Sequence, residues 1–399
     1  MRILNVGSSP SVEGGSDRYT HALAALLERR GHQVLTLTPR RGPLASDDEI
    51  AGPPPVETEN PGPGDAVRFV YSVPASESVE RALSEFRPDV VHLQVYYGQM
   101  TASILAPLRR ASVPVVQTLH DYKLACPVRT FISRDHVCEA CLGRRFWHAL
   151  PRLCNRGSLA RTSLSVLEAY VSRWLGDAET VDRFIAVSEF VRRKMIEHGV
   201  TGPERITTVH NFVETGPEPP ARGPGEHVLF VGRLSPIKGV STLLEAAATL
   251  APTPFVIAGD GPSRPSLERE ARERGITNVR FVGFVRGTEL DELVAGSVCT
   301  VLPSIGYETF GLAIVESFAA GRPAVASRVG GMTEVVTDGV DGFLVPPGDP
   351  EALHARLAWL LERPDEAVAM GVAGRRKVEH AFGPERHYER VMDVYRSVL

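Results

Sequence analysis

The chain of 399 residues has almost no lysine, no long apolar segment and no large excess of either charge. Its formal net charge of −4 lacks the basic surplus that is typical of proteins that bind nucleic acid, so we expect no such partner. No apolar run reaches the roughly 18 residues that a membrane-spanning helix needs. The N-terminus has the pattern of a strand rather than of a signal peptide. We therefore expect a cytoplasmic protein.

Lysine is rare enough to be informative. Only four of the 44 basic residues are lysine, and the remaining 40 are arginine. Because the composition favours arginine so strongly, a retained lysine carries some information, since a compact ammonium group suits some phosphate sites better than a guanidinium does. The four lysines are Lys123, Lys194, Lys238 and Lys377.

Two motifs of nucleotide-dependent enzymes are also missing. No Asp-x-Asp pair occurs, so nothing in the sequence suggests a metal ion that bridges a diphosphate, and we expect no catalytic metal. No Gly-x-Gly-x-x-Gly motif follows an apolar strand, since Gly259-Asp260-Gly261 lacks the third glycine. This absence argues against a dinucleotide-dependent oxidoreductase.

The first half of the chain alternates short apolar runs with helical patterns, which predicts a parallel sheet covered on both faces. Segment 39–66, rich in proline and glycine, is predicted to be a loop. The predicted strands are Ile3–Val6, Val34–Leu37, Val67–Val70, Val90–Leu93, Val113–Leu119 and Phe184–Val187. The predicted helices are Asp17–Arg30, Ser78–Phe86 and Met100–Ala111.

The same alternation restarts after segment 214–227, whose four prolines and three glycines cannot continue a helix or a central strand. The strands predicted there are Val228–Val231, Phe255–Ala258, Val279–Val282, Val298–Leu302 and Ala324–Ser327. We therefore expect an α/β protein with two Rossmann-like, doubly wound domains that face each other across a cleft. The predicted parts are domain 1–213 with an insertion at about 121–160, linker 214–227, domain 228–383, and a C-terminal helix in 384–399 able to cross back to the first domain.

Three loops that follow predicted strands of the second domain suit a nucleotide diphosphate. In the first, Gly232 allows close approach of the backbone to phosphate, while Arg233 and Lys238 supply cations near the start of a helix. Gly259-Asp260-Gly261 forms the second, and it is as typical of an ordinary turn as of a ligand loop. The third ends at Gly283, which either seats a flat base or simply ends a buried strand.

A fourth loop carries the most specific signal in the chain. Glu308 lies in the loop, and Glu316 follows eight positions later on the predicted helix. A loop carboxylate can accept hydrogen bonds from sugar hydroxyls, and one on the helix can hold those of a ribose. The free amides of Phe310, Gly311 and Leu312 would point at phosphate.

These motifs resemble glycosyltransferase family 4, which contains retaining enzymes of the GT-B fold. The resemblance rests on Gly232-Arg233, on Lys238 and on the Glu308 to Glu316 segment with its Phe310-Gly311 pair. It extends over nearly the whole chain. Further family-like positions are Gly14-Gly15, Thr118-Leu119-His120-Asp121, Val187-Ser188-Glu189-Phe190 and His210-Asn211-Phe212-Val213. One departure is Phe212, where many relatives have glycine, and it leaves the contact at Asn211 open.

The resemblance implies an assignment for each site residue. Arg233 and Lys238 would bind the donor diphosphate, Glu308 the transferred sugar, and Glu316 the ribose. In the first domain, His120 would lie against the sugar near the reaction centre, and Gly15 would let a backbone amide approach the donor phosphate.

The implied reaction transfers a hexose-type sugar from a nucleotide-diphosphate donor to a hydroxyl of a glycan, a lipid-linked molecule or a small molecule. The enzyme would be retaining and metal-independent, of the bacterial kind that builds cell-surface polysaccharides, glycolipids or natural products. Two alternatives stay open, a nucleotide-sugar 2-epimerase on the same fold and a nucleotide-sugar-binding scaffold without turnover. No set of carboxylates suited to the epimerase is identifiable.

Four of the five cysteines, Cys126, Cys138, Cys141 and Cys154, fall within 29 residues of the insertion, and Cys299 lies in an apolar strand as a core residue. The cluster contains one Cys-x-x-Cys pair. In a cytosolic protein such a cluster suits a tetrahedral structural zinc, and redox-active disulfides or free thiols are the other interpretations.

The same insertion is rich in arginine, with two aromatic residues among the basic ones. This mixture suits an anionic membrane surface at the inner face of the membrane or a lipid-diphosphate acceptor, while a solvated basic face is the plainer interpretation. The residues are Arg129, Arg134, Arg144, Arg145, Phe146, Trp147, Arg152, Arg156 and Arg161.

Overall fold

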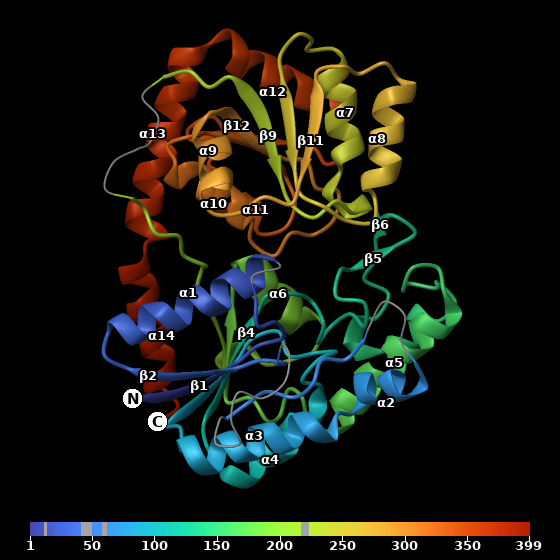
Figure 1. Ribbon diagram of the computed structural model, residues 1–399, viewed down its shortest axis with the longest axis vertical. Helices are drawn as coiled ribbons and strands as arrows, with labels where there is room; N and C mark the ends of the chain where they lie inside the picture. Colours follow the sequence, from blue (N-terminus) through green and yellow to red (C-terminus); the bar gives the residue numbers. More distant parts are fainter. Residues whose placement is uncertain (12–13, 41–49, 58–61, 217–222) are drawn as a thin grey trace. The chain divides into compact units, whose positions relative to one another are not determined.

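A computed structural model of the chain describes residues 1–11, 14–40, 50–57, 62–216 and 223–399 (Figure 1). Parts of the predicted loop 39–66 and of the predicted linker 214–227 lie outside these described residues. The chain divides into two compact units. The first comprises Met1–Arg134, Cys138–Val209 and Tyr388–Leu399, and the second comprises Asp135–Val137 and His210–His387.

The first unit is built on a parallel sheet of six strands in the order β2-β1-β3-β4-β7-β8. Its central strands β3 and β4 are buried along their whole length, which explains why they appear in the sequence as continuous apolar runs. The strands are β1 (Arg2–Val6), β2 (Gln33–Leu37), β3 (Val90–Leu93), β4 (Val115–Leu119), β7 (Arg183–Ala186) and β8 (Ile206–Thr208).

Helices and short turns connect these strands. The helices are α1 (Gly15–Arg29), α2 (Pro63–Val70), α3 (Val73–Phe86), α4 (Leu105–Ala111), α5 (Leu159–Trp174) and α6 (Glu189–Glu197). Single 3-10 turns are η1 (Ala102–Ile104), η2 (Leu142–Arg144), η3 (Phe146–Ala149) and η4 (Pro203–Arg205), and the short strands β5 (Ile132–Ser133) and β6 (His136–Val137) form a two-stranded sheet. Serines begin three of the helices, since Ser72, Ser158 and Ser188 each accept a hydrogen bond from a backbone amide three residues later.

The prediction of a strand at Val67–Val70 is wrong, because these residues lie in helix α2. Pro63 at the first helical position favours a helix, and the Asp65 carboxylate accepts a hydrogen bond from the Gly62 amide over 3.1 Å. Val67 is 68% exposed, so its apolar character does not mark a buried strand. The N-terminal signals of the helix therefore outweigh a short apolar run.

The second unit also has a parallel sheet of six strands, in the order β11-β10-β9-β12-β13-β14. The strands are β9 (His227–Val231), β10 (Phe255–Ala258), β11 (Val279–Gly283), β12 (Ser297–Leu302), β13 (Ala324–Ser327) and β14 (Gly342–Val345). The helices are α7 (Val240–Ala248), α8 (Arg264–Glu273), α9 (Thr288–Ala295), α10 (Leu312–Ala319), α11 (Met332–Val335), α12 (Pro350–Glu362), α13 (Pro364–Ala381) and α14 (Pro384–Arg396), with the turn η5 (Pro236–Lys238).

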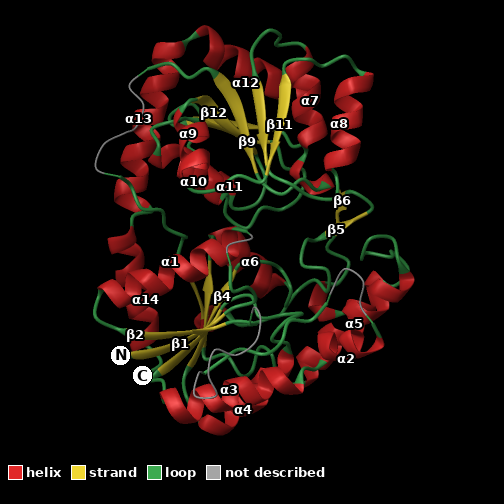
Figure 2. Cartoon of the chain, viewed as in Figure 1, coloured by secondary structure: helices red, strands yellow, loops and turns green. Residues whose placement is uncertain are grey.

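Successive residues of β9 pack into different apolar clusters. Val228 and Phe230 belong to a cluster with residues of α7, α8 and α12, whereas Leu229 packs with Leu290 and Val294 of α9. A strand that is buried on both faces between helices is the signature of a doubly wound domain. Figure 2 shows the strands of each unit lying among helices. Both units are therefore Rossmann-like α/β folds, as predicted.

Helix α14 begins in the second unit, and the chain from Tyr388 onward belongs to the first. There the Tyr388 hydroxyl lies 2.9 Å from His32 Nε2, and the Tyr395 hydroxyl lies 2.7 Å from the buried His92 Nδ1. Tyr395 is fully buried. Residues at the end of the sequence thus complete the packing around the first strands. Over the described part of the chain, no helix is both long and apolar enough to cross a membrane.

Candidate functional site

The loops after β9 and β10 are packed tightly on one another. Gly259 has a φ of 143°, and a Cβ atom at this position would lie 1.9 Å from the carbonyl oxygen of Gly232. The Gly259 amide also donates a hydrogen bond to the carbonyl oxygen of Gly283 over 2.6 Å. Close packing of backbone therefore requires glycine at position 259, whatever else this loop does.

The loop after β12 is fastened to the loop after β9 in the same way. The Ile305 amide donates a hydrogen bond to the Ile237 carbonyl oxygen over 2.8 Å. Gly239 has a φ of 64°, and a Cβ atom there would lie 2.0 Å from the carbonyl oxygen of Pro303. Any larger residue at position 239 would separate the two loops. This packing places Lys238 beside the segment that carries Glu308.

Lys238 and Glu308 form the central contact of the second unit's loops. The Lys238 Nζ atom donates to both carboxylate oxygens of Glu308, over 2.7 and 2.9 Å. The Ser304 hydroxyl donates to the same carboxylate over 2.6 Å, and Ser304 itself is fully buried. Sequence reasoning assigned Lys238 and Glu308 to different parts of a donor and missed Ser304. The structure brings all three side chains together.

The Glu308 backbone is held as firmly as its side chain. Its carbonyl oxygen accepts a hydrogen bond from the Gly331 amide over 2.8 Å. A Cβ atom at Gly330, which has a φ of 64°, would lie 2.2 Å from that oxygen. The carboxylate is thus presented from a fixed loop, with its charge offset by Lys238 and its orientation set by Ser304.

A first prediction concerns Ser304, whose hydroxyl orients Glu308. Replacing Ser304 with alanine should lower turnover about fivefold, because a typical hydrogen bond contributes about 1 kcal/mol and Lys238 still holds the carboxylate. Steady-state kinetics checks this. Ser266→Ala, which removes an exposed hydroxyl from α8, is the matched control and should leave turnover unchanged. Equal turnover in both variants would remove Ser304 from the site.

Helix α10 begins directly after the Glu308 loop. Gly311 at its N-cap has a φ of 100°, and no side chain caps the first amides of the helix. Such amides can bind an anion. Phe310 is 1% exposed and lies against the rings of His210 and Phe382, with centroid distances of 5.7 and 5.6 Å. The Phe310 side chain therefore anchors the loop in the core, and only its backbone can face a ligand.

The remaining predicted residues of this unit lie around these loops. Arg233 is exposed just after β9, and Glu316 is half-buried as the fifth residue of α10. Gly232 and Leu312 are half-buried, whereas Gly283 is buried at the end of β11. The structure thus puts the predicted donor residues of this unit on the loops after β9 and β12, on helix α10 and at the end of β11.

The departure from the family pattern at Phe212 has a structural reason. The Phe212 ring is 5% exposed and stacks on His387, with a centroid distance of 4.6 Å and an interplanar angle of 29°. Burial lowers the pKa of His387 to about 4, so this histidine is neutral when it packs against the phenyl ring. The neighbouring Asn211 is also buried.

In the first unit, His120 directly follows β4 and belongs to a chain of side-chain hydrogen bonds. Its Nε2 atom lies 2.9 Å from Gln94 Oε1, and the Gln94 amide donates to Asn5 Oδ1 over 3.1 Å. The Tyr19 ring packs edge-on against the imidazole at 4.7 Å. Because the Gln94 amide group is turned toward Asn5, its oxygen faces His120 and requires a proton on Nε2. Sequence reasoning missed Gln94, although a polar residue after a buried apolar strand was a visible signal.

Gly14 and Gly15 begin helix α1, with Gly14 at the N-cap. A Cβ atom on Gly14 would meet no described atom within 4 Å, so packing does not require glycine there. Gly15 is exposed at the first helical position. A glycine that packing does not require is consistent with a backbone that a ligand must approach closely.

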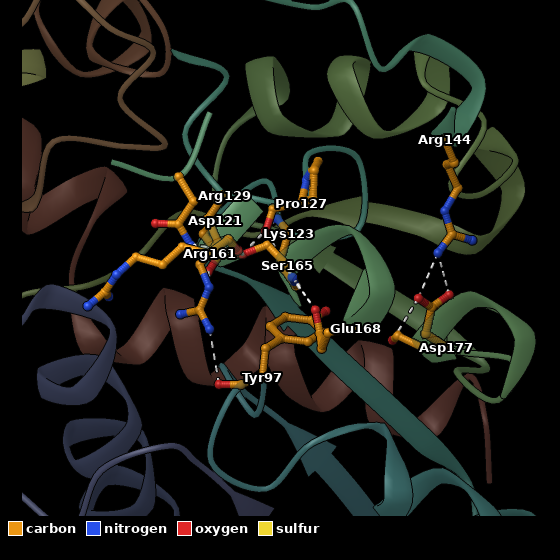
Figure 3. Close-up of polar contacts among 12 residues, drawn as sticks. Tyr97, Asp121, Lys123, Pro127, Arg129, Arg144, Arg161, Ser165, Glu168 and Asp177 are labelled. Atoms are coloured by element: carbon orange, nitrogen blue, oxygen red, sulfur yellow. Dashed lines mark hydrogen bonds and ion pairs between the residues drawn. The ribbon is translucent and has the colours of Figure 1, made fainter. Parts of the chain in front are cut away.

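The segment after His120 is held by two buried ion pairs (Figure 3). Lys123 pairs with Glu168 of α5, and these side chains are 4% and 0% exposed. Arg144 donates to both carboxylate oxygens of Asp177 over 2.6 Å, again with almost no exposure. Arg144 is therefore a core residue, and its interpretation as part of a basic surface is wrong. The two pairs join the insertion to α5 and to the turn after it.

The structure also gathers the four clustered cysteines. Cys126, Cys138, Cys141 and Cys154 line a single cavity in the first unit, and all are free thiols. Cys299 is fully buried within β12, which confirms its interpretation as a core residue.

Comparison with known proteins agrees with this architecture. The family model for Glycosyltransferase Family 4 matches residues 13–216, and the model for Glycosyl transferases group 1 matches residues 216–377. A glycogen synthase from Mycobacterium tuberculosis is 30% identical over 410 residues, which cover 96% of this chain and 91% of that protein.

Solved structures share the fold over the full length. The Anabaena protein Alr3699/HepE in complex with UDP has a TM-score of 0.70 and 20% identity, with both chains covered completely. The sucrose-phosphate synthase from Thermosynechococcus elongatus has a TM-score of 0.76 and 21% identity, covering 99% of this chain and 98% of that one. Two Rossmann-like units with these relatives define a glycosyltransferase of the GT-B type. The chain belongs to glycosyltransferase family 4.

Proposed function

We propose that this glycosyltransferase is a retaining hexosyltransferase that uses a nucleotide-diphosphate sugar and needs no metal ion. Its acceptor would be a hydroxyl group of a glycan, a lipid-linked molecule or a small molecule. The observation that carries the proposal is the contact of Lys238 with Glu308, because it puts a cation for the leaving diphosphate beside a carboxylate for the sugar.

The chemistry of the transfer explains what these residues would do. The bond from the anomeric carbon to the diphosphate breaks, positive charge develops on the sugar ring, and negative charge collects on the leaving phosphate. Lys238, Arg233 and the first amides of α10 would stabilise that phosphate in place of a metal ion. The electron pair of the broken bond stays with the diphosphate, whose oxygen can take the proton of an acceptor hydroxyl on the same face.

The pairing of Lys238 with Glu308 suggests how the site is held ready. The charges of Lys238 and Glu308 offset each other until the Lys238 ammonium group binds a diphosphate instead. The Glu308 carboxylate, still held by Ser304, can then accept hydrogen bonds from sugar hydroxyls. Preorganised groups of this kind stabilise the transition state because they need little rearrangement.

The residues outside this contact are assigned by resemblance. Glu316 would hold the ribose of the donor, and His120 and Gly15 of the first unit would act on the sugar and on the donor phosphate. For His120, the proton on Nε2 and the hydrogen bond to Gln94 fix the ring orientation.

We also propose that the insertion lies on the acceptor side of the enzyme and binds an anionic surface. Arg134, Arg145 and Arg156 are exposed, and Trp147 is 52% exposed beside them in sequence. Cationic and aromatic side chains together favour phosphate-rich lipid headgroups or a lipid-linked diphosphate. Sedimentation with vesicles that contain anionic lipid tests this, with neutral vesicles as the control.

A donor screen tests the proposed function directly. A panel of UDP-, GDP- and dTDP-sugars is added at increasing concentration, and the thermal midpoint is measured. A donor present at about 100 times its dissociation constant should add roughly 2.7 kcal/mol to the free energy of unfolding. Turnover of that donor in the presence of excess EDTA, with NMR of the product's anomeric configuration, then tests metal independence and retention. Loss of activity in EDTA or an inverted product would contradict the proposal.

A second prediction separates the two glutamates. Glu308→Gln should impair turnover about a hundredfold but leave affinity for the free nucleoside diphosphate nearly unchanged, because Glu308 serves the sugar. Glu316→Gln should weaken diphosphate affinity about tenfold, since a hydrogen bond to a charged group is worth about 1.5 kcal/mol or more. Isothermal calorimetry with the diphosphate alone distinguishes them. Equal losses of affinity in both variants would show that the roles are not separate.

A further inference from the structure

The cavity lined by the four cysteines is a feature that the transfer reaction does not use. Cys126 comes from the segment after β4, Cys138 and Cys141 come from the turn after β6, and Cys154 comes from the segment after η3. Three separate stretches of chain thus contribute sulfur atoms to one small space. Cys126 and Cys141 are 6% and 8% exposed.

The four cysteines line the same small cavity together with His148 and Arg152. Arg152 lines the same cavity and contributes a favourable positive charge at Cys141. Cys126 and Cys141 are buried and Cys138 and Cys154 are half-buried, and four cysteines around one small cavity are a ligand set suited to zinc.

The backbone holds Cys126 in a fixed turn. The Cys126 amide donates a hydrogen bond to the Tyr122 carbonyl oxygen over 2.7 Å, and the Arg129 amide donates to the Cys126 carbonyl oxygen over 2.9 Å. The position from which the Cys126 side chain lines the cavity is therefore set by the local backbone.

The surrounding segment has little regular secondary structure of its own. Between Lys123 and α5, regular structure is limited to the two-residue strands β5 and β6 and the short turns η2 and η3. Its apolar contacts with α5 amount to a small cluster, in which Phe146 and Ala149 pack on Val166 and Ala169 beside Cys141. A loop with so little regular structure gains further from a cross-link, in addition to the two buried ion pairs that hold it.

We propose that Cys126, Cys138, Cys141 and Cys154 bind one zinc ion as a tetrathiolate site that fastens the insertion. Four sulfur ligands suit tetrahedral zinc, and Arg152 would offset part of the excess negative charge. Throughout the described ranges, no three or more His, Cys, Asp or Glu side chains are already arranged to hold a metal ion. Binding therefore requires the cysteine side chains to rotate toward the centre of the cavity that they line.

Metal analysis of the full chain tests the proposal. Protein purified without chelator should contain about one zinc per chain by elemental analysis. Cys141→Ser should lose most of it, whereas Cys299→Ser, which changes a buried thiol of the second unit, should retain it. Cobalt substitution should give the intense absorption of sulfur-to-cobalt charge transfer.

A thiol titration of the unmodified protein guards against variants that fail to fold. Stepwise addition of a mercurial reagent should release the zinc as four thiols react, and a colorimetric chelator measures the release. Alkylation under native conditions, followed by mass spectrometry, counts the free thiols and detects any disulfide. Two disulfides within the cluster, four free thiols without metal, or zinc retained in Cys141→Ser would each overturn the proposal.

Discussion

Replacing Lys238 with alanine is expected to lower turnover about a hundredfold while the protein remains folded. The Lys238 ammonium group lies within 2.9 Å of both Glu308 carboxylate oxygens. During transfer it would instead donate hydrogen bonds to the leaving diphosphate. Loss of one preorganised charge donor typically costs ~10²–10³ in turnover. The Glu308 carboxylate keeps its hydrogen bond from Ser304 in this variant, so the thermal midpoint should change by only a few degrees. Steady-state kinetics with a donor identified in the screen gives the measurement.

A second lysine supplies the matched control. Lys194→Ala removes an ion pair with Glu139 and Glu197 in the first unit, and its effect on turnover should be less than twofold. Lys238→Arg should recover only part of the activity, because a planar guanidinium cannot replace a compact ammonium in the same geometry. Full activity in Lys238→Ala would move the phosphate site away from these loops.

Removal of Lys123 is expected to have the largest effect on stability. Lys123→Met leaves the Glu168 carboxylate buried without its ion-pair partner, and such a loss costs about 3–5 kcal/mol of unfolding free energy. Across the described residues, neither oxygen of Glu168 accepts a hydrogen bond of good geometry, so the pair with Lys123 is its main compensation. Chemical denaturation, followed by a probe in the first unit, measures the change.

The double variant separates the buried charge from general damage to the core. Lys123→Met combined with Glu168→Leu should regain most of the lost stability, since two apolar residues of similar volume can replace a buried pair. Arg110→Ala breaks an exposed pair with Glu80 and should cost less than about 1 kcal/mol. A double variant as unstable as Lys123→Met would show that the charges themselves are needed.

The strands that are buried on both faces were the most predictable part of the fold. The predicted strands Phe255–Ala258 and Ala324–Ser327 coincide with β10 and β13 residue for residue. Strands β8 and β14 were missed. In β14 the apolar signal is only Phe343-Leu344-Val345, which is too short to separate a strand from a turn by pattern. The strand predicted at Val67–Val70 rests on four residues of mostly apolar character, whereas the signals of helix α2 lie before them, at Pro63 and Asp65.

The residues of the candidate site can be proposed from the sequence by type, but their contacts cannot. Glu308 and Lys238 could be named from the sequence, yet they are 70 positions apart. Their contact depends on β9 and β12 being neighbours in the sheet, which no local pattern reveals. Ser304 and Gln94 share a signal that could have found them, since each is a polar residue that follows a buried apolar strand closely.

The assignment of Tyr388–Leu399 to the first unit has a consequence for the order of folding. These residues are synthesised after the whole second unit, yet Tyr395 fills the core of the first unit and bonds to His92. A nascent chain that has produced only β1 to β8 therefore lacks part of its own interior. The first unit therefore stays incompletely packed while the second unit is translated and can fold. Its core is completed only after Tyr395 has been synthesised.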